Sequence, residues 1–243
     1  MSRIVLFGAV IAIGFVTLPR ALRAHDPLAA FPPVVLWSWE HPDDLRFVNP
    51  KVAGVAFLAK TVWLSRDGVV ARPRLSKLQY SLGTALMPVV RFESAGDGLP
   101  DSSAVVTEVV RTAGLSGIRA LQIDFDARES ERAWYAAFLR ELRGALPAAL
   151  PLTMTALVSW CDEDDWITRL PVDDACPMWF RMGTRPVPAP HAFNAGLCKA
   201  SVGISTDELP DRVPRHQRLF IFHPGAWTKQ SYEAAIAQAR RWR

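Results

Sequence analysis

The stretch ALQIDFD, residues 120–126, alternates apolar and polar side chains over its last six positions. Successive side chains of a β-strand point to opposite faces, so Gln122, Asp124 and Asp126 share one face and the apolar residues between them share the other. In a parallel barrel the apolar face packs on surrounding helices and the polar face projects into the lumen. Burial and mutual repulsion of two carboxylates raise the pKa of one of them, which produces a general acid.

Seven more short apolar runs share the chain with this one, and turn or helix signals separate them. We expect strands at residues 34–39, 52–58, 85–92, 120–125, 152–158, 176–181, 201–205 and 219–223. Amphipathic helices are expected at 103–113, 130–146 and 229–242, and a hairpin around Asp67 and Gly68 at 61–72. The connections at 42–48, 163–170 and 191–198 are abbreviated.

This order of elements predicts one small (β/α)8 TIM-like barrel domain over residues 31–243, with some abbreviated helices. An open, doubly wound sheet is the alternative. The 243 residues are 50% hydrophobic and 21% charged, which is enough for a full core. This composition excludes disordered, collagen-like and coiled-coil proteins.

Residues 1–24 have the pattern of an export signal. An apolar run at residues 4–18 follows Arg3 and ends before Pro19, which is typical of a secretory signal peptide and short for a membrane span. We expect cleavage after Ala24, with an uncleaved N-terminal anchor as the alternative. The rest of the chain is then periplasmic or extracellular, and any attachment to the inner membrane is through this leader alone.

The basic charge of the chain comes mainly from the same leader. Three arginines lie in residues 1–24, so 28 − 3 = 25 basic residues face 24 acidic ones in the remainder. The remaining bases are scattered and form no stripe. We therefore expect no nucleic-acid partner.

Polar residues at the carboxyl ends of the expected strands form the candidate site, because barrel enzymes build their sites there. We predict Asp126 as the general acid/base, Asp124 as its modulating partner, and Glu93 or else Glu40 as a second carboxylate. The expected substrate-binding residues are Glu40, Arg91, Gln122, Trp160, Arg181, His223 and Trp227. Carboxyl groups beside indole faces, here those of Trp160 and Trp227, suit hydrolysis of a glycan or oligosaccharide.

Two other interpretations use the same acidic residues. In the first, Arg91 or Arg181 neutralises Asp124 and Asp126 in a buried ion-pair network without function. In the second, Asp124, Asp126 and His223 bind a metal ion in a hydrolase. No HxH, HExxH or HxxxH motif accompanies His223, and no Gly-rich phosphate loop or GxSxG motif occurs, so we expect no metal and no other cofactor.

Three cysteines remain after the leader: Cys161, Cys176 and Cys198. In an oxidising compartment outside the cytoplasm, two of them can form a disulfide. The strand order puts Cys176 and Cys198 at the bottom of adjacent strands and Cys161 at the opposite rim. The sequence therefore predicts a Cys176–Cys198 disulfide, with three buried thiols as the alternative.

Seven ordered segments resemble one known group of proteins. They are WSWE (37–40), GVAFLAKT (54–61), VVRFES (89–94), LQIDFDARESER (121–132), TALVSWC (155–161), PMWFRMG (177–183) and SVGISTDE (201–208). The group is an uncharacterised family of exported bacterial proteins, a domain of unknown function. The resemblance implies export and a glycosidase-like barrel, and it leaves the reaction open.

The fourth expected strand also resembles, more loosely, the DxxDxDxE strand of chitinase-type glycoside hydrolases, whose final Glu is the acid. Asp124 and Asp126 match the two in-line aspartates of that motif. Arg128 stands at the position of the acid, and Glu129 comes one residue late. Asp126 or Glu93 would have to supply the acid here.

These inferences lead to an exported, glycoside-hydrolase-like protein that acts on a glycan by carboxylate acid/base catalysis. The alternative is a noncatalytic envelope protein that binds carbohydrate or peptidoglycan in the same cleft.

Overall fold

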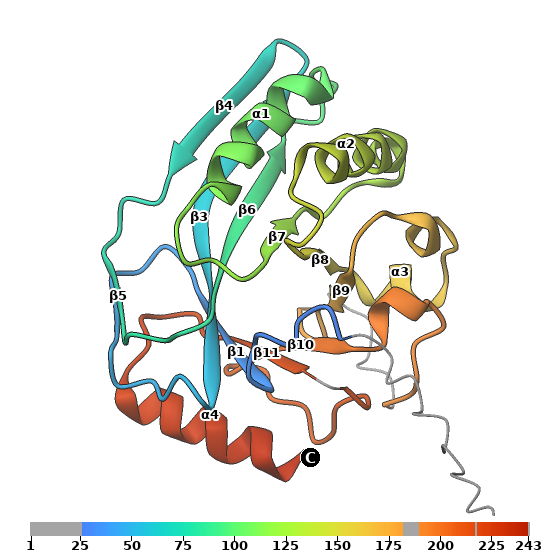
Figure 1. Cartoon of the computed structure of the whole chain (residues 1–243). Coiled ribbons are helices and arrows are strands. Elements are labelled where there is room, and N and C mark those ends of the chain that lie inside the picture. Colours follow the sequence, from blue (N-terminus) through green and yellow to red (C-terminus); the bar gives the residue numbers. More distant parts are fainter. Residues whose placement is uncertain (1–25, 182–189, 217, 243) are drawn as a thin grey trace, which may run out of the picture.

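Eight parallel strands follow one another around a nearly closed barrel in the computed structural model, which describes residues 26–181, 190–216 and 218–242 (Figure 1). Their order is β10 (Ser201–Ser205), β11 (Arg218–Phe222), β1 (Val34–Ser38), β3 (Ala53–Ser65), β6 (Leu86–Ser94), β7 (Leu121–Asp124), β8 (Leu152–Ala156) and β9 (Asp174–Pro177). The chain after β9 returns to β10 through a parallel bridge between Met178 and Gly203. The predicted TIM-like barrel is confirmed.

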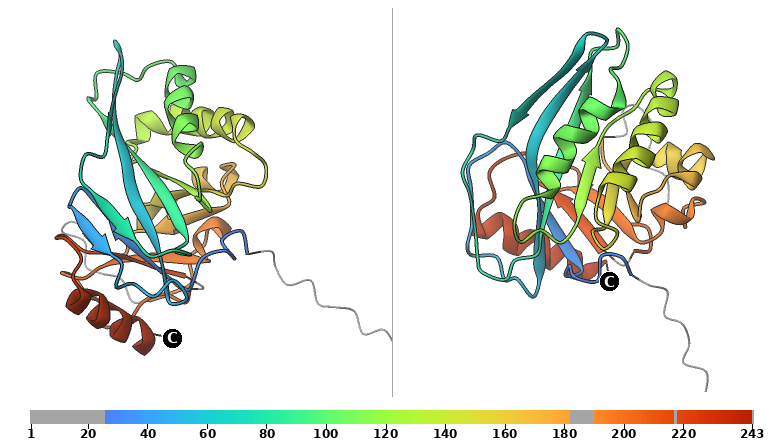
Figure 2. Two further views of the ribbon diagram at one scale, coloured as in Figure 1. Left: turned by 60° about the vertical axis from the view of Figure 1, so that its left-hand side comes forward. Right: turned by 45° about the horizontal axis from the view of Figure 1, so that its top comes forward.

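Three helices that the sequence predicts cover the outside of the barrel (Figure 2). They are α1 (Ser102–Ala113), α2 (Arg132–Ala145), which follows the short helix η1 (Glu129–Glu131), and α4 (Lys229–Arg241). Asp101 accepts a hydrogen bond from the Ser103 amide at the start of α1, and Thr228 accepts one from Ser231 in α4. These caps satisfy amide groups that the first turn of a helix leaves without partners.

The other connections are short, as the sequence predicts. β2 (Asp43–Leu45) pairs with β5 (Leu78–Tyr80) in a separate two-stranded sheet. After β8 the chain forms α3 (Val158–Asp162) and η2 (Trp166–Arg169), and η3 (Gly196–Cys198) precedes β10.

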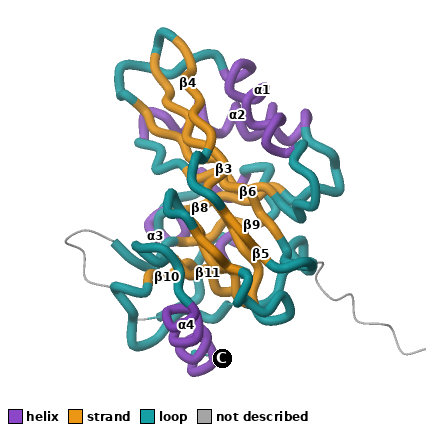
Figure 3. The backbone as a smooth tube through the Cα atoms, turned by 90° about the vertical axis from the view of Figure 1, so that its left-hand side faces the viewer, coloured by secondary structure: helices purple, strands orange, loops and turns teal. Residues whose placement is uncertain are grey.

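The hairpin expected at 61–72 is present and larger than the sequence predicts. β3 continues to Ser65 and turns at Gly68, whose φ of 147° suits glycine, into the antiparallel strand β4 (Gly68–Pro73). β3 also stays paired with β6 as far as Leu64 and Ser94. These three strands extend above the barrel, beside α1 (Figures 1 and 3). We call the extension, residues 60–73 together with residues 91–94, the wing.

The barrel lumen is closed at its lower end and open at its upper end. Phe31, from the segment before β1, closes the bottom and lies against Gly54, where an added Cβ would come within 2.8 Å of its ring. Trp37 lies across Gly203 in the same way, and a Cβ added there would come within 2.7 Å of the Trp37 ring. Buried side chains therefore fill the lower lumen, and a ligand reaches it from the carboxyl ends of the strands. Among them are the polar residues Thr153, Asp174, Ser201 and Arg218.

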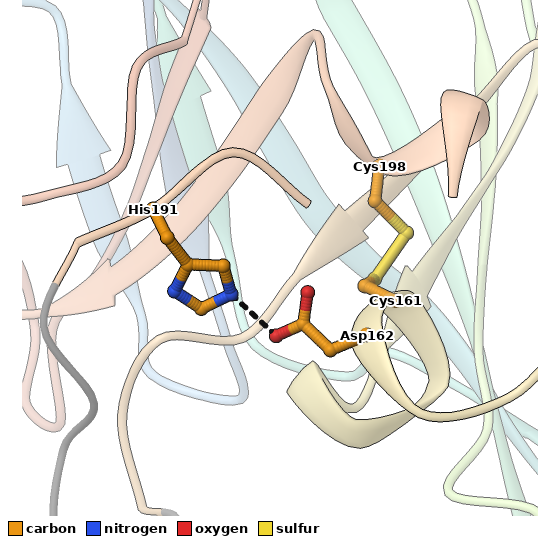
Figure 4. The surroundings of a disulfide bond; sticks show 4 residues. All are labelled: Cys161, Asp162, His191 and Cys198. Atoms are coloured by element: carbon orange, nitrogen blue, oxygen red, sulfur yellow. Dashed lines mark hydrogen bonds and ion pairs between the residues drawn. A yellow bond between two sulfur atoms is a disulfide. The ribbon is translucent and has the colours of Figure 1, made fainter. Parts of the chain in front are cut away.

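The disulfide prediction is wrong in its pairing. Cys161 and Cys198 are bonded, with their Cα atoms 5.9 Å apart, and Cys176 is a buried thiol (Figure 4). The Cys176 side chain points into the lumen, where its sulfur would lie 3.4 Å from a Cβ on Gly203. α3 instead folds back over the outside of the barrel and brings Cys161 to η3. The strand order alone did not show which face each cysteine takes.

The expected leader, residues 1–24, lies outside the described residues. In the described part of the chain, no helix is long and apolar enough to cross a membrane.

Candidate functional site

A cavity of about 850 Å³ opens at the carboxyl ends of the barrel strands. Its size is typical of sites for small molecules, which measure roughly 300–1,000 Å³. Its lining is Trp37, Trp39, Val89, Arg91, Gln122, Asp124, Asp126, Thr155, Leu157, Val158, Ser159, Asp162, Glu163, Met178, Phe180, Arg181 and Phe222. The lining divides into an acidic wall and an aromatic wall on different sides of the barrel.

β7 and the second residue after its end, Asp126, build the acidic wall. Gln122, Asp124 and Asp126 all reach the cavity, as their alternation predicts. Gln122 is fully buried, and its amide oxygen accepts a hydrogen bond from Nε1 of Trp37 at 2.8 Å. One step higher, Asp124 accepts a hydrogen bond from the Thr155 hydroxyl of β8 at 2.7 Å. Asp126 stands at the exposed end of this row.

Both carboxyl groups hold protons at higher pH than free aspartate does. Burial raises the pKa of Asp124 to about 6, against the hydrogen bond from Thr155, and repulsion from Asp126 adds to the rise. Partial burial also raises the pKa of Asp126, Arg91 opposes that rise, and Glu93 adds to it. A carboxyl group that keeps its proton near pH 6 is able to donate it to a leaving group.

Arg91 lies beside both these aspartates and the second predicted carboxylate, Glu93. It lies opposite Asp124 in the pairing of β6 with β7 and makes an ion pair with Glu93 at 2.6 Å. Glu93 lines a smaller hollow of about 130 Å³, which Asp124 and Asp126 also line. Among the described residues, no ion pair neutralises Asp124 or Asp126. The interpretation as a closed ion-pair network therefore fails for these two carboxyl groups.

The aromatic wall comes from β1, β11 and the segment after β9. It contains Trp37, Trp39, Phe180 and Phe222. Phe180 and Phe222 stack with nearly parallel rings 6.0 Å apart, and Trp39 meets Phe222 edge to face at 6.1 Å. Trp37 is buried, whereas Trp39 and Phe222 are half-buried. Aromatic faces opposite carboxyl groups form a surface on which the apolar face of a sugar ring can pack.

The two tryptophans predicted as stacking platforms are not in this cavity. Trp160 is 1% exposed and packs against Trp166 with ring centroids 4.9 Å apart. Trp227 is 4% exposed and donates its indole hydrogen to the Trp37 carbonyl at 2.8 Å. Both positions follow strand ends, yet both side chains turn outward into the core between the barrel and its covering elements. Trp39 faces the cavity instead.

Two other predicted residues, Arg181 and Glu40, lie at the edge of the site. Arg181 lines the cavity, with its guanidinium 5.1 Å from the Phe222 ring centre and 3.4 Å from Asp207. Glu40 is outside the cavity lining and is paired with Arg72 at 2.9 Å.

His223 is also outside the cavity lining. It shares a hydrogen bond of 2.6 Å with the Thr206 hydroxyl, and burial lowers its pKa. Among the described residues, no three His, Cys, Asp or Glu side chains are grouped as metal ligands. The metal interpretation, which needs His223 beside Asp124 and Asp126, has no support in this geometry.

Sequence reasoning missed a third part of the cavity lining, which Asp162 and Glu163 form in the segment after β8. The Asp162 carboxyl group and the His191 ring nitrogen Nε2 are hydrogen-bonded at 2.7 Å, next to the disulfide (Figure 4). The Asn194 side-chain amide also donates a hydrogen bond to the backbone carbonyl of Asp162 at 2.8 Å. The acidic run CDEDD, residues 161–165, was the signal that could have identified these carboxylates.

The pKa of Asp124 should respond to the loss of one neighbouring hydroxyl. Thr155→Val keeps the shape of the side chain and removes the donor to Asp124, so we expect the pKa of Asp124 to rise above its value of about 6. Carbon-13 NMR titration of the aspartate carboxyl groups measures the change.

Thr153→Val is the matched control. Its hydroxyl is one step lower in the lumen and donates to the Leu121 carbonyl at 3.3 Å. If Asp124 titrates with the same pKa in wild type and in Thr155→Val, the assigned hydrogen bond is contradicted.

Comparison with known proteins confirms the resemblance to an uncharacterised family over about a third of the chain. Residues 99–179, which include Asp124 and Asp126, match the family model described as a domain of unknown function (DUF3142). No curated protein matches the chain significantly.

Among solved structures, the chain is similar to the crystal structure of the Bacillus cereus spore cortex-lytic enzyme SleL. The sequence identity is 17% and the TM-score is 0.47, over 72% of this chain and 51% of that one. The chain thus spans about half the length of that enzyme.

Proposed function

We propose that this protein is an exported hydrolase that cleaves a glycan in the cavity at the carboxyl ends of its barrel strands. One observation carries the proposal: two carboxyl groups with raised pKa values, Asp124 and Asp126, face an open cavity whose other wall is aromatic. A site of this kind can protonate a glycosidic oxygen while a sugar ring packs on the aromatic side chains.

Asp126 is the general acid/base in this proposal, because it stands highest in the row and is open to the cavity. It gives its proton to the glycosidic oxygen as the bond from that oxygen to the anomeric carbon breaks. A water molecule supplies the hydroxyl group that replaces the leaving sugar, and its second proton returns to the carboxylate. Every atom of the water therefore ends on the two products or on Asp126.

Asp124 acts through Asp126 and the substrate. The hydrogen bond from the Thr155 hydroxyl fixes the Asp124 carboxyl group, and the pairing of β7 with β8 holds the two residues side by side. Its negative charge, once the proton has left, stabilises positive charge that develops on the sugar ring. Arg91 limits how far both pKa values rise, because it opposes the effect of burial on each carboxyl group.

Export is part of the proposal, and two features support it. The pattern of residues 1–24 is that of a leader, and the Cys161–Cys198 disulfide suits an oxidising compartment outside the cytoplasm.

One observation favours a second candidate, a noncatalytic protein that binds carbohydrate or peptidoglycan. Arg128 stands where the chitinase-type motif has its acid, and Glu93 is held by Arg91. A protein with this cavity and no competent acid would bind a glycan without cleaving it.

Incubation of the purified protein with peptidoglycan, chitin, cellulose and bacterial exopolysaccharides tests the two candidates. For the hydrolase we expect soluble saccharides in the mass spectrum from at least one polymer. Retention on a polymer without release of saccharides would identify the binding protein. The absence of both retention and cleavage would overturn the glycan assignment.

A further inference from the structure

We propose that the wing carries a second sugar-binding subsite, centred on Trp63, for the part of a glycan chain that extends out of the cavity. This inference rests on the proposed function and adds to it that the substrate is a polymer longer than the cavity.

Trp63 is a large aromatic side chain on the surface, 40% exposed, near the end of β3. Its position follows from an irregularity in the pairing of β3 with β6, where the register shifts between Leu58 and Lys60. Before the shift, Ala56 packs in the lumen. After it, Lys60 points outward and pairs with Glu108 of α1 at 3.1 Å. A bulge re-aims the residues that follow it.

The shift puts Trp63 on the face of the sheet that continues the cavity. Trp63 is paired with Glu93, and Thr61 with Arg91, in the register of β3 and β6. Because Arg91 lines the cavity, alternation places Glu93 and Trp63 on the same face as that lining. Val62, between Thr61 and Trp63, is fully buried on the opposite face in the core.

Side chains between the cavity and Trp63 form a continuous row. The Arg91 guanidinium lies over the Trp39 ring at 5.6 Å and pairs with Glu93. Glu93 is two residues beyond Arg91, a rise of about 7 Å along the strand. Trp63 stands beside Glu93 in the next strand. An aromatic ring in the cavity, a charged pair and a second aromatic ring therefore follow each other outward.

Neighbouring side chains hold the Trp63 ring in place. The Arg72 guanidinium, from β4, lies 5.5 Å from the ring centre, and Glu40 fixes Arg72 through an ion pair at 2.9 Å. Glu40 follows Trp39 in the chain. The predicted site residue Glu40 thus has a place in this arrangement, where it positions Arg72 and does not contact the cavity.

The occupant that fits this surface is the same glycan chain. Sugar rings present apolar faces that pack on indole rings and hydroxyl groups that bond to paired Arg and Glu side chains. The exposed Val70 beside Trp63 widens the apolar part of the surface. Continuity with the cavity lining argues for one extended ligand and against an unrelated protein partner.

Trp63→Ala tests the subsite with chitin, cellulose and peptidoglycan as polymers and with the disaccharide of each. We expect the Kd for the retained polymer to rise about 3–10-fold, which is the effect of losing one aromatic contact. The Kd for the matching disaccharide, which fits inside the cavity, should stay within twofold. Trp63→Phe should restore most of the polymer affinity.

Tyr80→Ala is the control, because Tyr80 is a surface aromatic of similar exposure, 45%, on β5 outside the wing. Thermal unfolding of all three variants checks their folding. Unchanged polymer affinity in Trp63→Ala, or an equal loss for polymer and disaccharide, would overturn the subsite while leaving the cavity as the site. If the wild-type protein binds neither polymer nor disaccharide, the proposed function fails together with the subsite.

Discussion

Replacement of Asp126 by asparagine should lower the rate of glycan hydrolysis by about 10²–10⁴-fold, the usual contribution of a general acid or base. The amide has nearly the shape of the carboxyl group and cannot deliver its proton. Asp126 makes no ion pair among the described residues, so its replacement leaves no buried cation without a partner. Affinity for the polymer should stay within about twofold of wild type. Initial rates at saturating polymer and retention in affinity electrophoresis give the two quantities.

Asp44→Asn is the matched control for this carboxylate-to-amide change. Asp44 is on the surface, where Arg46 binds its carboxylate and lowers its pKa to about 2, and it is outside the cavity lining. Its replacement should leave the hydrolysis rate unchanged. A rate in Asp126→Asn within tenfold of wild type would remove Asp126 from the role of acid/base and leave Asp124 as the remaining candidate in that row.

The same assignment fixes the shape of the pH dependence. A raised carboxyl pKa means that the proton needed for catalysis is present at low pH and is lost as the pH rises through the raised value. Asp126 must hold its proton and Asp124, whose pKa is about 6, must have lost its own. The rate should therefore pass through a maximum: it falls at high pH as Asp126 loses its proton and falls below about pH 6 as Asp124 gains one. A rate that increases steadily from pH 5 to pH 8 would contradict a protonated carboxyl group in the free site.

The barrel and its acidic row were predictable because both follow from local patterns. Alternation in residues 121–126 places Gln122, Asp124 and Asp126 on one face whatever the neighbouring strands are. Other apolar runs of the sequence form β1, β8 and β10, and these strands are buried on both faces. Parallel strands covered by helices need such runs, so their lengths and spacing indicate the architecture.

The direction of side chains in the connections was not predictable in the same way. Trp160 lies in α3, and a short helix after a strand has no fixed orientation toward the cavity until its packing is known. Trp227 likewise follows β11, and a hydrogen bond to the Trp37 carbonyl draws it under the rim. The position of Trp63 depends on a bulge between Leu58 and Lys60, which the sequence does not mark. Each case depends on contacts between segments far apart in the chain.

Removal of the disulfide should have the largest effect on stability. Cys161 and Cys198 are 37 residues apart in the chain, and closing a loop of that length contributes about 4 kcal/mol to the free energy of unfolding. We therefore expect Cys161→Ala/Cys198→Ala to lose about 4 kcal/mol in urea unfolding. The double variant is used because a single replacement would leave a reactive thiol.

Cys176→Ala separates the disulfide from the ordinary cost of a smaller buried side chain. Cys176 is a buried thiol in the lumen, so its replacement should cost less than the double variant and should not change the response to reductant. Reductant should destabilise wild type and Cys176→Ala and leave the double variant unaffected. Reductant-independent unfolding of wild type would show that the bond does not stabilise the fold. Asp162 follows Cys161 directly and lines the cavity. Loss of the disulfide removes the covalent link between this segment and η3, so it should also weaken glycan binding.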